Sequence, residues 1–304
     1  MSIFSLISRN GPTGFGYAST AEDVTRGMAL AGKTVLVTGC NSGLGLETMR
    51  VLALRGAQVI GTARTKAKAD AAAKLVTGGK ATGLACELAD PASIRACVAS
   101  VKAMGVRLDA IVANAGIMAL PVLELAHGYE LQFFTNHIGH FALVTGLLDS
   151  LADDGRVVML SSSAHSNAPL GGIEFDNLDG ARGYRPWAAY GQSKLANLLF
   201  AKALAQRFAG TRQTAYAVHP GVIRTNLVRH MNPVVRGIMA VFGAVFLKSI
   251  PQGAATQCFC AVNPGAVALS GNYFADCNVA QCRAEANDAA LARKLWDTSE
   301  KIIA

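Results

Sequence analysis

The chain has 304 residues, of which 51% are hydrophobic and 16% are charged, and this composition excludes an intrinsically disordered protein. The length fits one large α/β domain or two small domains. The formal net charge is +8, but the basic residues are scattered without a polybasic run or interleaved aromatic residues, so a nucleic-acid partner is not expected. A bound cofactor that carries several phosphates would explain part of the positive charge.

Strand-like and helical segments alternate along the chain. A leader over residues 1–30 should contain a short helix that begins at Ser19 or Thr20. Apolar runs predict strands at 33–39, 58–64, 81–88, 108–116, 155–163, 213–221 and 270–276. Helical spacing predicts helices at 44–57, 66–76, 91–104, 129–151, around 187–199 and at 288–302. Such alternation is typical of a parallel sheet covered on both faces, so residues 31–304 should form one doubly wound Rossmann-type α/β domain with a sheet of about seven strands.

The segment TGCNSGLG connects the first of these strands to the first long helix. Its glycines would let the backbone turn tightly and approach a pyrophosphate, whose charge is stabilised by the helix N-terminus. The candidate cofactor-binding residues here are Gly39, Asn41, Ser42, Gly43, Leu44 and Gly45.

The end of the second strand favours NADP(H) over NAD(H). Proteins selective for NAD place an acidic residue about 20 residues after the glycines to bind the ribose 2′-hydroxyl. Here the first acidic residue is Asp70, whereas Arg64, with Lys66 and Lys68 nearby, could hold a 2′-phosphate. The alternative is a solvated basic helix start.

The segment WAAYGQSKLANLL places Tyr190 and Lys194 four residues apart, which puts them on one face of a helix. Taken alone, this spacing is common on exposed helix surfaces. Its chemical meaning therefore depends on the rest of the chain.

Five segments in order resemble those of the short-chain dehydrogenase/reductase family: TGCNSGLG, ANAG (113–116), SSS (161–163), YGQSK (190–194) and HPGVIRT (219–225). The resemblance runs from Gly32 to about Ala275. The segments TNHIGHFAL, SSSAH and YGQSKLANLLF are similar to the branch that contains retinol dehydrogenases, the WW-domain-containing oxidoreductase and light-dependent protochlorophyllide reductases.

This resemblance implies a set of site residues. Tyr190 would be the catalytic acid/base, Lys194 its activator and a ligand of the ribose, Ser162 the residue that orients the carbonyl, and Asn136 the catalytic asparagine. Ser161 and Ser163 remain alternatives to Ser162. Further cofactor-binding residues would be Asn114, Ala115, Gly116, Pro220, Gly221, Val222 and Thr225. Glu87 stands where the branch often has an aspartate that touches the adenine, so this contact would shift or pass to the backbone of Leu88.

These residues suit a hydride transfer. A carbonyl that accepts hydride needs a proton, and a free tyrosine with a pKa near 10 is a poor partner at neutral pH. A lysine ammonium on the same helix face, together with the positively charged nicotinamide ring of the oxidised cofactor, is expected to lower that pKa, and Ser162 can donate to the carbonyl oxygen. Asn136 could hold a water molecule that connects Lys194 to solvent. No metal is expected, because His137 and His140 lack a third ligand.

Apolar segments after the strands suggest a hydrophobic substrate. The residues from about 226 to 250 include Val234, Met239, Phe242 and Phe246, and Gly237–Leu247 is far shorter than the roughly 20 residues of a membrane-spanning helix. We interpret the segment as a lid, with a subunit interface or shallow membrane contact as alternatives.

The sequence thus predicts a cytoplasmic NADP(H)-dependent oxidoreductase that acts on a hydrophobic alcohol, aldehyde or ketone. Seven cysteines without a CxxC pair and the absence of a signal-peptide pattern underlie the predicted location. A reductase of a conjugated C=C bond and a non-catalytic dinucleotide-binding regulator are the alternatives. A monomer, a homodimer and a homotetramer all remain open.

Overall fold

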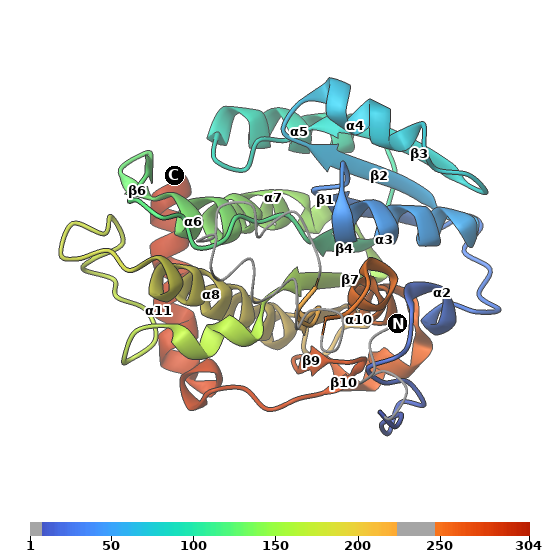
Figure 1. The fold of residues 1–304 in the computed structure, drawn as a ribbon. Helices are drawn as coiled ribbons and strands as arrows, with labels where there is room; N and C mark the ends of the chain where they lie inside the picture. Colours follow the sequence, from blue (N-terminus) through green and yellow to red (C-terminus); the bar gives the residue numbers. More distant parts are fainter. Residues whose placement is uncertain (1–7, 224–246) are drawn as a thin grey trace.

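A computed structural model describes residues 8–223 and 247–304, and its centre is an eight-stranded sheet (Figure 1). The strands are β1 (Thr34–Thr38), β2 (Gln58–Ala63), β3 (Lys80–Ala85), β4 (Leu108–Ala113), β7 (Leu151–Leu160), β8 (Thr214–His219), β9 (Tyr273–Ala275) and β10 (Asn278–Val279). Their order is β10-β9-β8-β7-β4-β1-β2-β3. All neighbouring pairs are parallel except β9 and β10. The mostly parallel α/β sheet predicted from the sequence is confirmed, with one strand more than the expected seven.

The strand order reverses at β1, which has β2 on one side and β4 on the other. In open parallel sheets, ligands bind beyond the carboxyl ends of the strands at such a reversal. The segments that follow β1, β4, β7 and β8 therefore surround the candidate site.

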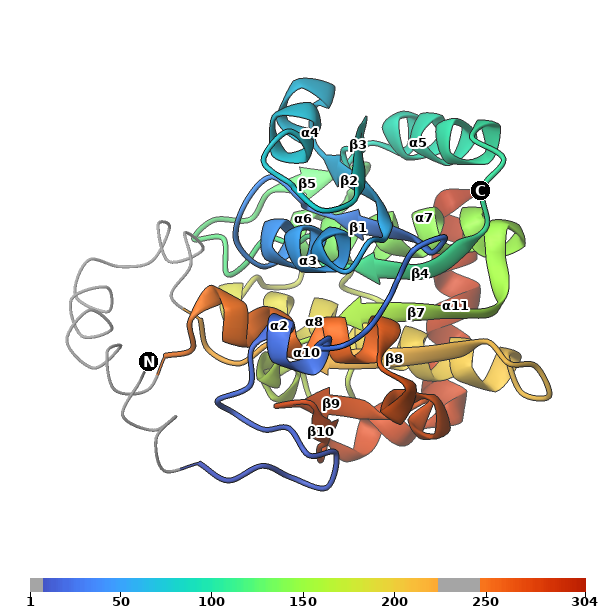
Figure 2. The ribbon, with the colours of Figure 1, turned by 90° about the vertical axis from the view of Figure 1, so that its right-hand side faces the viewer.

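Helices cover both faces of the sheet. One face carries α2 (Ala21–Val24), α3 (Gly43–Leu54), α4 (Lys66–Ala73) and α10 (Ile250–Val262), and the other carries α5 (Pro91–Ala103), α7 (Gly139–Leu147), α8 (Pro186–Arg207) and α11 (Ala289–Ile303). In Figure 2, α2 and α10 lie in front of the sheet, and α7 and α11 lie behind it. This arrangement gives two separate apolar layers.

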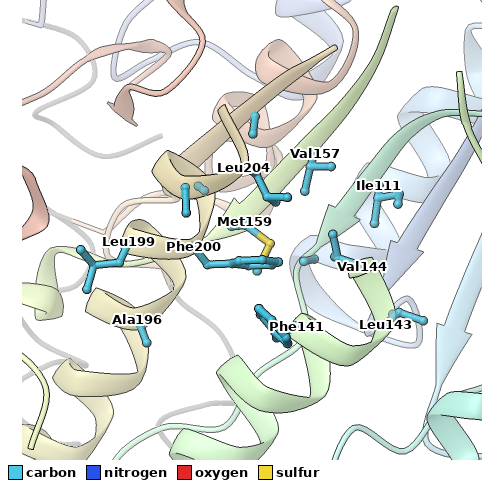
Figure 3. Close-up of a cluster of buried hydrophobic side chains, with 14 of the residues drawn as sticks. Ile111, Phe141, Leu143, Val144, Val157, Met159, Ala196, Leu199, Phe200 and Leu204 are labelled. Atoms are coloured by element: carbon cyan, nitrogen blue, oxygen red, sulfur yellow. The ribbon is translucent and has the colours of Figure 1, made fainter. Parts of the chain in front are cut away.

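The apolar layer between the sheet and helices α7, α8 and α11 is rich in aromatic side chains. Phe141 lies 5.0 Å, between ring centroids, from both Phe200 and Trp296. Figure 3 shows Phe141 and Phe200 packed beside Met159 of β7. Because these large side chains are fully or almost fully buried, they fix α8 firmly against the sheet.

The helix expected at 129–151 is interrupted. Tyr129–Glu130 form the short strand β6, paired with β5 (Leu125–Ala126), and the helical part is divided into α6 (Leu131–Phe133), a π-helix (Phe134–Ile138), α7 and a 3₁₀ turn (Leu148–Ser150). The buried carboxylate of Glu130 accepts the backbone N–H groups of Gln132 and Phe133, so helical structure begins after Glu130. The π-helix carries Asn136, one of the predicted site residues. Short π-helical segments are frequent at functional sites.

The leader packs against the last strands. Thr20 forms a capping box with Asp23 at the start of α2, as the sequence predicted. The Asn278 side chain accepts the backbone N–H of Thr13 and donates to the carbonyl of Phe15. Within residues 8–223 and 247–304, every helix is too short or too polar to cross a membrane.

Candidate active site

Helix α8 brings Tyr190 and Lys194 together, as their spacing predicted. It begins at Pro186, whose fixed φ suits the first helical position. Tyr190 is 8% exposed and Lys194 is 2% exposed, and the Lys194 Nζ lies 5.6 Å from the centroid of the Tyr190 ring. Both side chains are therefore buried within the protein, unlike an ordinary surface pair.

The three serines after β7 have different surroundings. The Ser161 hydroxyl is buried and donates to the backbone carbonyl of Lys194 at 2.7 Å. Ser163 is exposed, and its backbone N–H donates to Nδ1 of His219. Ser162 is half-buried beside the Tyr190 phenol and accepts the backbone N–H of Ala164. Of the three predicted candidates, Ser162 is the one that lies against the tyrosine.

Asn136 connects α8 to the segment after β4. Its side-chain Oδ1 accepts the N–H of Ile117, while its Nδ2 donates to the Ile117 carbonyl and to the Ser193 hydroxyl, each at 2.9 Å. A Cβ atom on Gly116 would lie 3.0 Å from Asn136 Oδ1 and 3.3 Å from Lys194 Nζ. A side chain at this position would crowd both groups, so a glycine lets the backbone after β4 lie close to the lysine.

The glycine loop forms a narrow turn. A Cβ atom on Gly45 would lie 2.2 Å from the carbonyl oxygen of Gly39, so only glycine fits there. Asn114 donates to the carbonyl of Thr38 and holds the turn against the end of β4. Asn41 and Ser42 are exposed, and the Ser42 side chain makes no capping bond at the start of α3.

Leu44, one of the predicted cofactor-binding residues, has a buried side chain. It is 9% exposed and lies against Gly253 of α10. Its side chain therefore packs between α3 and α10, and its contact with a cofactor stays a prediction. Leu44 lies on the inward face of α3, where an apolar side chain joins the core.

The basic residues after β2 separate into two kinds. Lys66 forms an ion pair with Asp70 at 2.6 Å. The exposed Arg64 guanidinium makes no hydrogen bond or ion pair with any described residue. Near the expected adenine position, Leu88 is buried, and Glu87 accepts the backbone N–H of Ala89. Arg64 and Glu87 are thus held at the same edge of the sheet, beyond β2 and β3.

An ion pair between a buried lysine and a partly exposed aspartate lies next to the segment after β8. Gly221 adopts a φ of 89°, and a Cβ atom there would lie 2.7 Å from the Lys248 side chain. The Lys248 Nζ lies 2.5 Å from Asp276 Oδ1, and its backbone N–H donates to the carbonyl of Val222. Lys248 and Asp276 were not predicted as site residues, because nothing in the local sequence around either residue indicates the other. Thr225 and most of the predicted 226–250 lid lie outside the described residues.

Comparisons with known proteins agree with this geometry. Residues 33–175 match the short chain dehydrogenase family. The chain is 40% identical to short-chain dehydrogenase TIC 32 B, chloroplastic, of Brassica napus, over 100% of this chain and 99% of the relative. It is 41% identical to human retinol dehydrogenase 11, over 90% of this chain and 87% of the relative.

The chain belongs to the short-chain dehydrogenase/reductase family. A solved structure of a blue fluorescent protein from a metagenomic library, in complex with NADPH, has the same fold as this dehydrogenase, with a TM-score of 0.66 and 25% identity over 81% of this chain and 96% of that chain. The family and the retinol-dehydrogenase-like branch predicted from the sequence are confirmed.

Burial shifts the pKa values of Tyr190 and Lys194 in this short-chain dehydrogenase. Burial raises the pKa of Tyr190 to about 12, and only the Ser162 hydroxyl opposes that rise. Burial also lowers the pKa of Lys194 to about 8. These pKa shifts belong to the protein without a cofactor, and the expectation that Lys194 and an oxidised nicotinamide together lower the tyrosine pKa stays a prediction.

His137 of the π-helix and His140 of α7 have different hydrogen-bond partners. His137 contacts Asn197 and Ser299, whereas His140 contacts Thr38 and the backbone of Asn136. In the described part of the dehydrogenase, no three His, Cys, Asp or Glu residues are close enough together to hold a metal ion.

Proposed function

We propose that the protein is an NADP(H)-dependent oxidoreductase that transfers hydride between the nicotinamide and a hydrophobic alcohol, aldehyde or ketone. Membership of the short-chain dehydrogenase/reductase family supports an oxidoreductase. The observation that carries the proposal is the buried pair of Tyr190 and Lys194, with Ser162 beside the phenol.

Lys194 is suited to chemistry because it has no acidic partner in the described part of the chain. Its Nζ donates to the carbonyl of Leu160 at 3.1 Å, and no carboxylate lies within ion-pair distance. A buried ammonium without a counter-ion is costly, and such groups concentrate at functional sites. The two remaining N–H donors of Lys194 could bind a ribose hydroxyl.

A dinucleotide fits the residues around the glycine loop. The tight turn at Gly39 and Gly45 brings backbone close to the pyrophosphate position, and the α3 N-terminus offers unpaired N–H groups and the free Ser42 hydroxyl. The exposed Arg64 would bind a 2′-phosphate, and its lack of a partner among the described residues supports NADP(H) over NAD(H). The structure of the related blue fluorescent protein, with NADPH bound, is consistent with this choice.

Exposed apolar side chains support a hydrophobic substrate. Leu123, Leu170, Trp187 and Val222 belong to segments that follow β4, β7 and β8, and they are between 38% and 99% exposed. Trp187 also packs edge-on against Tyr190, with 6.2 Å between ring centroids. These segments place apolar surface at the carboxyl edge of the sheet, where an alkyl or aromatic substrate would be desolvated.

The residues divide the reaction as follows. The bound nicotinamide would supply or accept the hydride. Tyr190 stays protonated near neutral pH, because its pKa is raised to about 12, and it would give its proton to the substrate oxygen during reduction. Ser162 would donate to the same oxygen, and Lys194 would offset the charge left on the phenolate.

The test is turnover of NADPH, followed at 340 nm, with a panel of apolar aldehydes, ketones and enones. Wild-type protein should consume NADPH with carbonyl substrates, and Tyr190→Phe should lose turnover but still bind NADPH. Unchanged turnover in Tyr190→Phe would contradict the mechanism. Product analysis distinguishes an alcohol from a saturated ketone, and so tests reduction of a conjugated C=C bond.

The proposal extends to the setting of the enzyme. A cytoplasmic location and a hydrophobic small-molecule partner remain predictions, and the relative from Brassica napus carries the word chloroplastic in its name. Fractionation of cells that express a tagged chain would test the location. Light scattering of the purified protein would distinguish a monomer, a homodimer and a homotetramer.

A further inference from the structure

His140 lies fully buried between two parts of the candidate site. On one side its Nε2 is 2.8 Å from the Thr38 hydroxyl, at the end of β1 and next to the glycine loop. On the other side its Nδ1 is 2.9 Å from the backbone carbonyl oxygen of Asn136. One imidazole ring thus joins the strand that precedes the glycine loop to the π-helix that carries Asn136.

The neighbouring hydrogen bonds determine which ring nitrogen carries the proton. Thr38 Oγ1 accepts the backbone N–H groups of Asn114 and Ala115, each at 2.9 Å, and these use both of its lone pairs. The Thr38 hydroxyl must therefore donate its proton to Nε2 of His140. The carbonyl of Asn136 can only accept, so Nδ1 carries the hydrogen.

The direction of this chain of hydrogen bonds requires a neutral ring. Burial lowers the pKa of His140 to about 4, in agreement with a neutral imidazole at ordinary pH. Neutral histidine in water favours the other tautomer, with the proton on Nε2. The surroundings of His140 thus select a specific, less common form.

We propose that His140 is a positioning residue which, as the Nδ1–H tautomer, couples the end of β1 beside the glycine loop to the Asn136 turn and through it to α8. This inference rests on the proposed function. The coupling continues from Asn136 to Ser193, which lies next to Lys194 on α8. His140 itself touches neither the cofactor position nor the substrate position.

Two substitutions test the two hydrogen bonds of the His140 ring one at a time. In His140→Asn the amide can replace Nδ1–H toward Asn136, but Thr38 loses its acceptor. In His140→Gln the longer amide can reach Thr38, but the donor to Asn136 is lost. Leaving one buried polar group unpaired should change the affected property about tenfold. We expect His140→Asn to weaken NADPH binding with kcat nearly unchanged, and His140→Gln to lower kcat with NADPH binding nearly unchanged.

His137 provides a matched control. It lies three residues earlier, is equally buried, and bonds to Asn197 and Ser299 on the side away from the glycine loop. His137→Asn should lower the melting temperature without altering NADPH binding or kcat. If both His140 variants behave like His137→Asn, His140 has only a structural role and the proposal is wrong.

A second measurement does not depend on variants that fold. The ¹⁵N shifts of the His140 ring in the intact protein report its tautomer, and we expect Nδ1–H between pH 6 and about 8. An Nε2–H tautomer would overturn the proposal. Absence of turnover in wild-type protein would contradict the proposed function instead, while the tautomer and the NADPH affinity of His140→Asn would still decide the role of His140.

Discussion

Two lysines near the site are equally buried but have opposite surroundings. Lys194 is 2% exposed and bonds to a neutral carbonyl, whereas Lys248 is 1% exposed and lies 2.5 Å from the Asp276 carboxylate. Lys248 also lies 4.9 Å from the centroid of the Tyr17 ring. Lys248 thus has a counter-ion within the fold, while Lys194 has none among the described residues. Burial alone therefore does not distinguish the two lysines, whereas the counter-ion does, and only Lys194 has the proposed role in catalysis.

The largest effect should come from removing the unpaired lysine. Lys194→Met should lower kcat about 10³-fold, because the charge that offsets the phenolate is lost. The same change should stabilise the cofactor-free protein at neutral pH, because a desolvated charge is removed. Steady-state kinetics and urea unfolding of the purified variant measure both effects. Lys202→Met, two turns further along α8, is the control and should change neither.

The lowered pKa of Lys194 also predicts the direction in which the stability of the protein changes with pH. The pKa of Lys194 is lowered to about 8 in the folded protein from 10.5, so the unfolded chain binds more protons between these values. Wild-type stability should therefore gain a rising contribution as the pH increases from about 8 to 10. Lys194→Met should lack that contribution. An identical pH slope in the two proteins would show that Lys194 is not desolvated as the structure indicates.

Removing either partner of the pair between Lys248 and Asp276 should destabilise the protein, but by different amounts. Asp276→Asn leaves the Lys248 ammonium buried without a counter-ion and should cost about 3 kcal/mol in the free energy of unfolding. Lys248→Met leaves an aspartate whose side chain is 41% exposed and can be hydrated, so the cost should be smaller, about 1 kcal/mol. Urea unfolding of the two variants gives the order. A larger loss for Lys248→Met would mean that packing beneath Gly221, rather than charge, dominates at this position.

The sequence was informative where a feature depends on neighbouring residues. The glycine loop, the apolar strands and the i, i+4 pair of Tyr190 and Lys194 are local patterns, and the structure contains all of them. The contact between Lys248 and Asp276 joins residues 28 positions apart, and that between His140 and Thr38 joins residues 102 positions apart. Neither follows from helical or strand periodicity. The desolvation of Tyr190 and Lys194 was missed for the same reason, since it depends on everything packed around α8.

The smallest effect on activity should come from exposed cations. There, too, one cation has an acidic partner and another has none. Arg64 is exposed and has no acidic partner in the part of the chain that the structure describes, whereas Lys66 forms an ion pair with Asp70. If an unpaired cation marks a binding role, Arg64→Leu should raise the KM for NADPH about 10-fold, the loss expected for one charge-assisted contact, and leave the KM for NADH unchanged. Lys66→Leu should change both constants less than twofold, because its charge is already balanced. Equal losses for the two variants would mean that the contrast holds only for buried lysines. An exposed cation without a partner costs little free energy, because water solvates it. In that case the lack of an acidic partner would not indicate that Arg64 binds a phosphate.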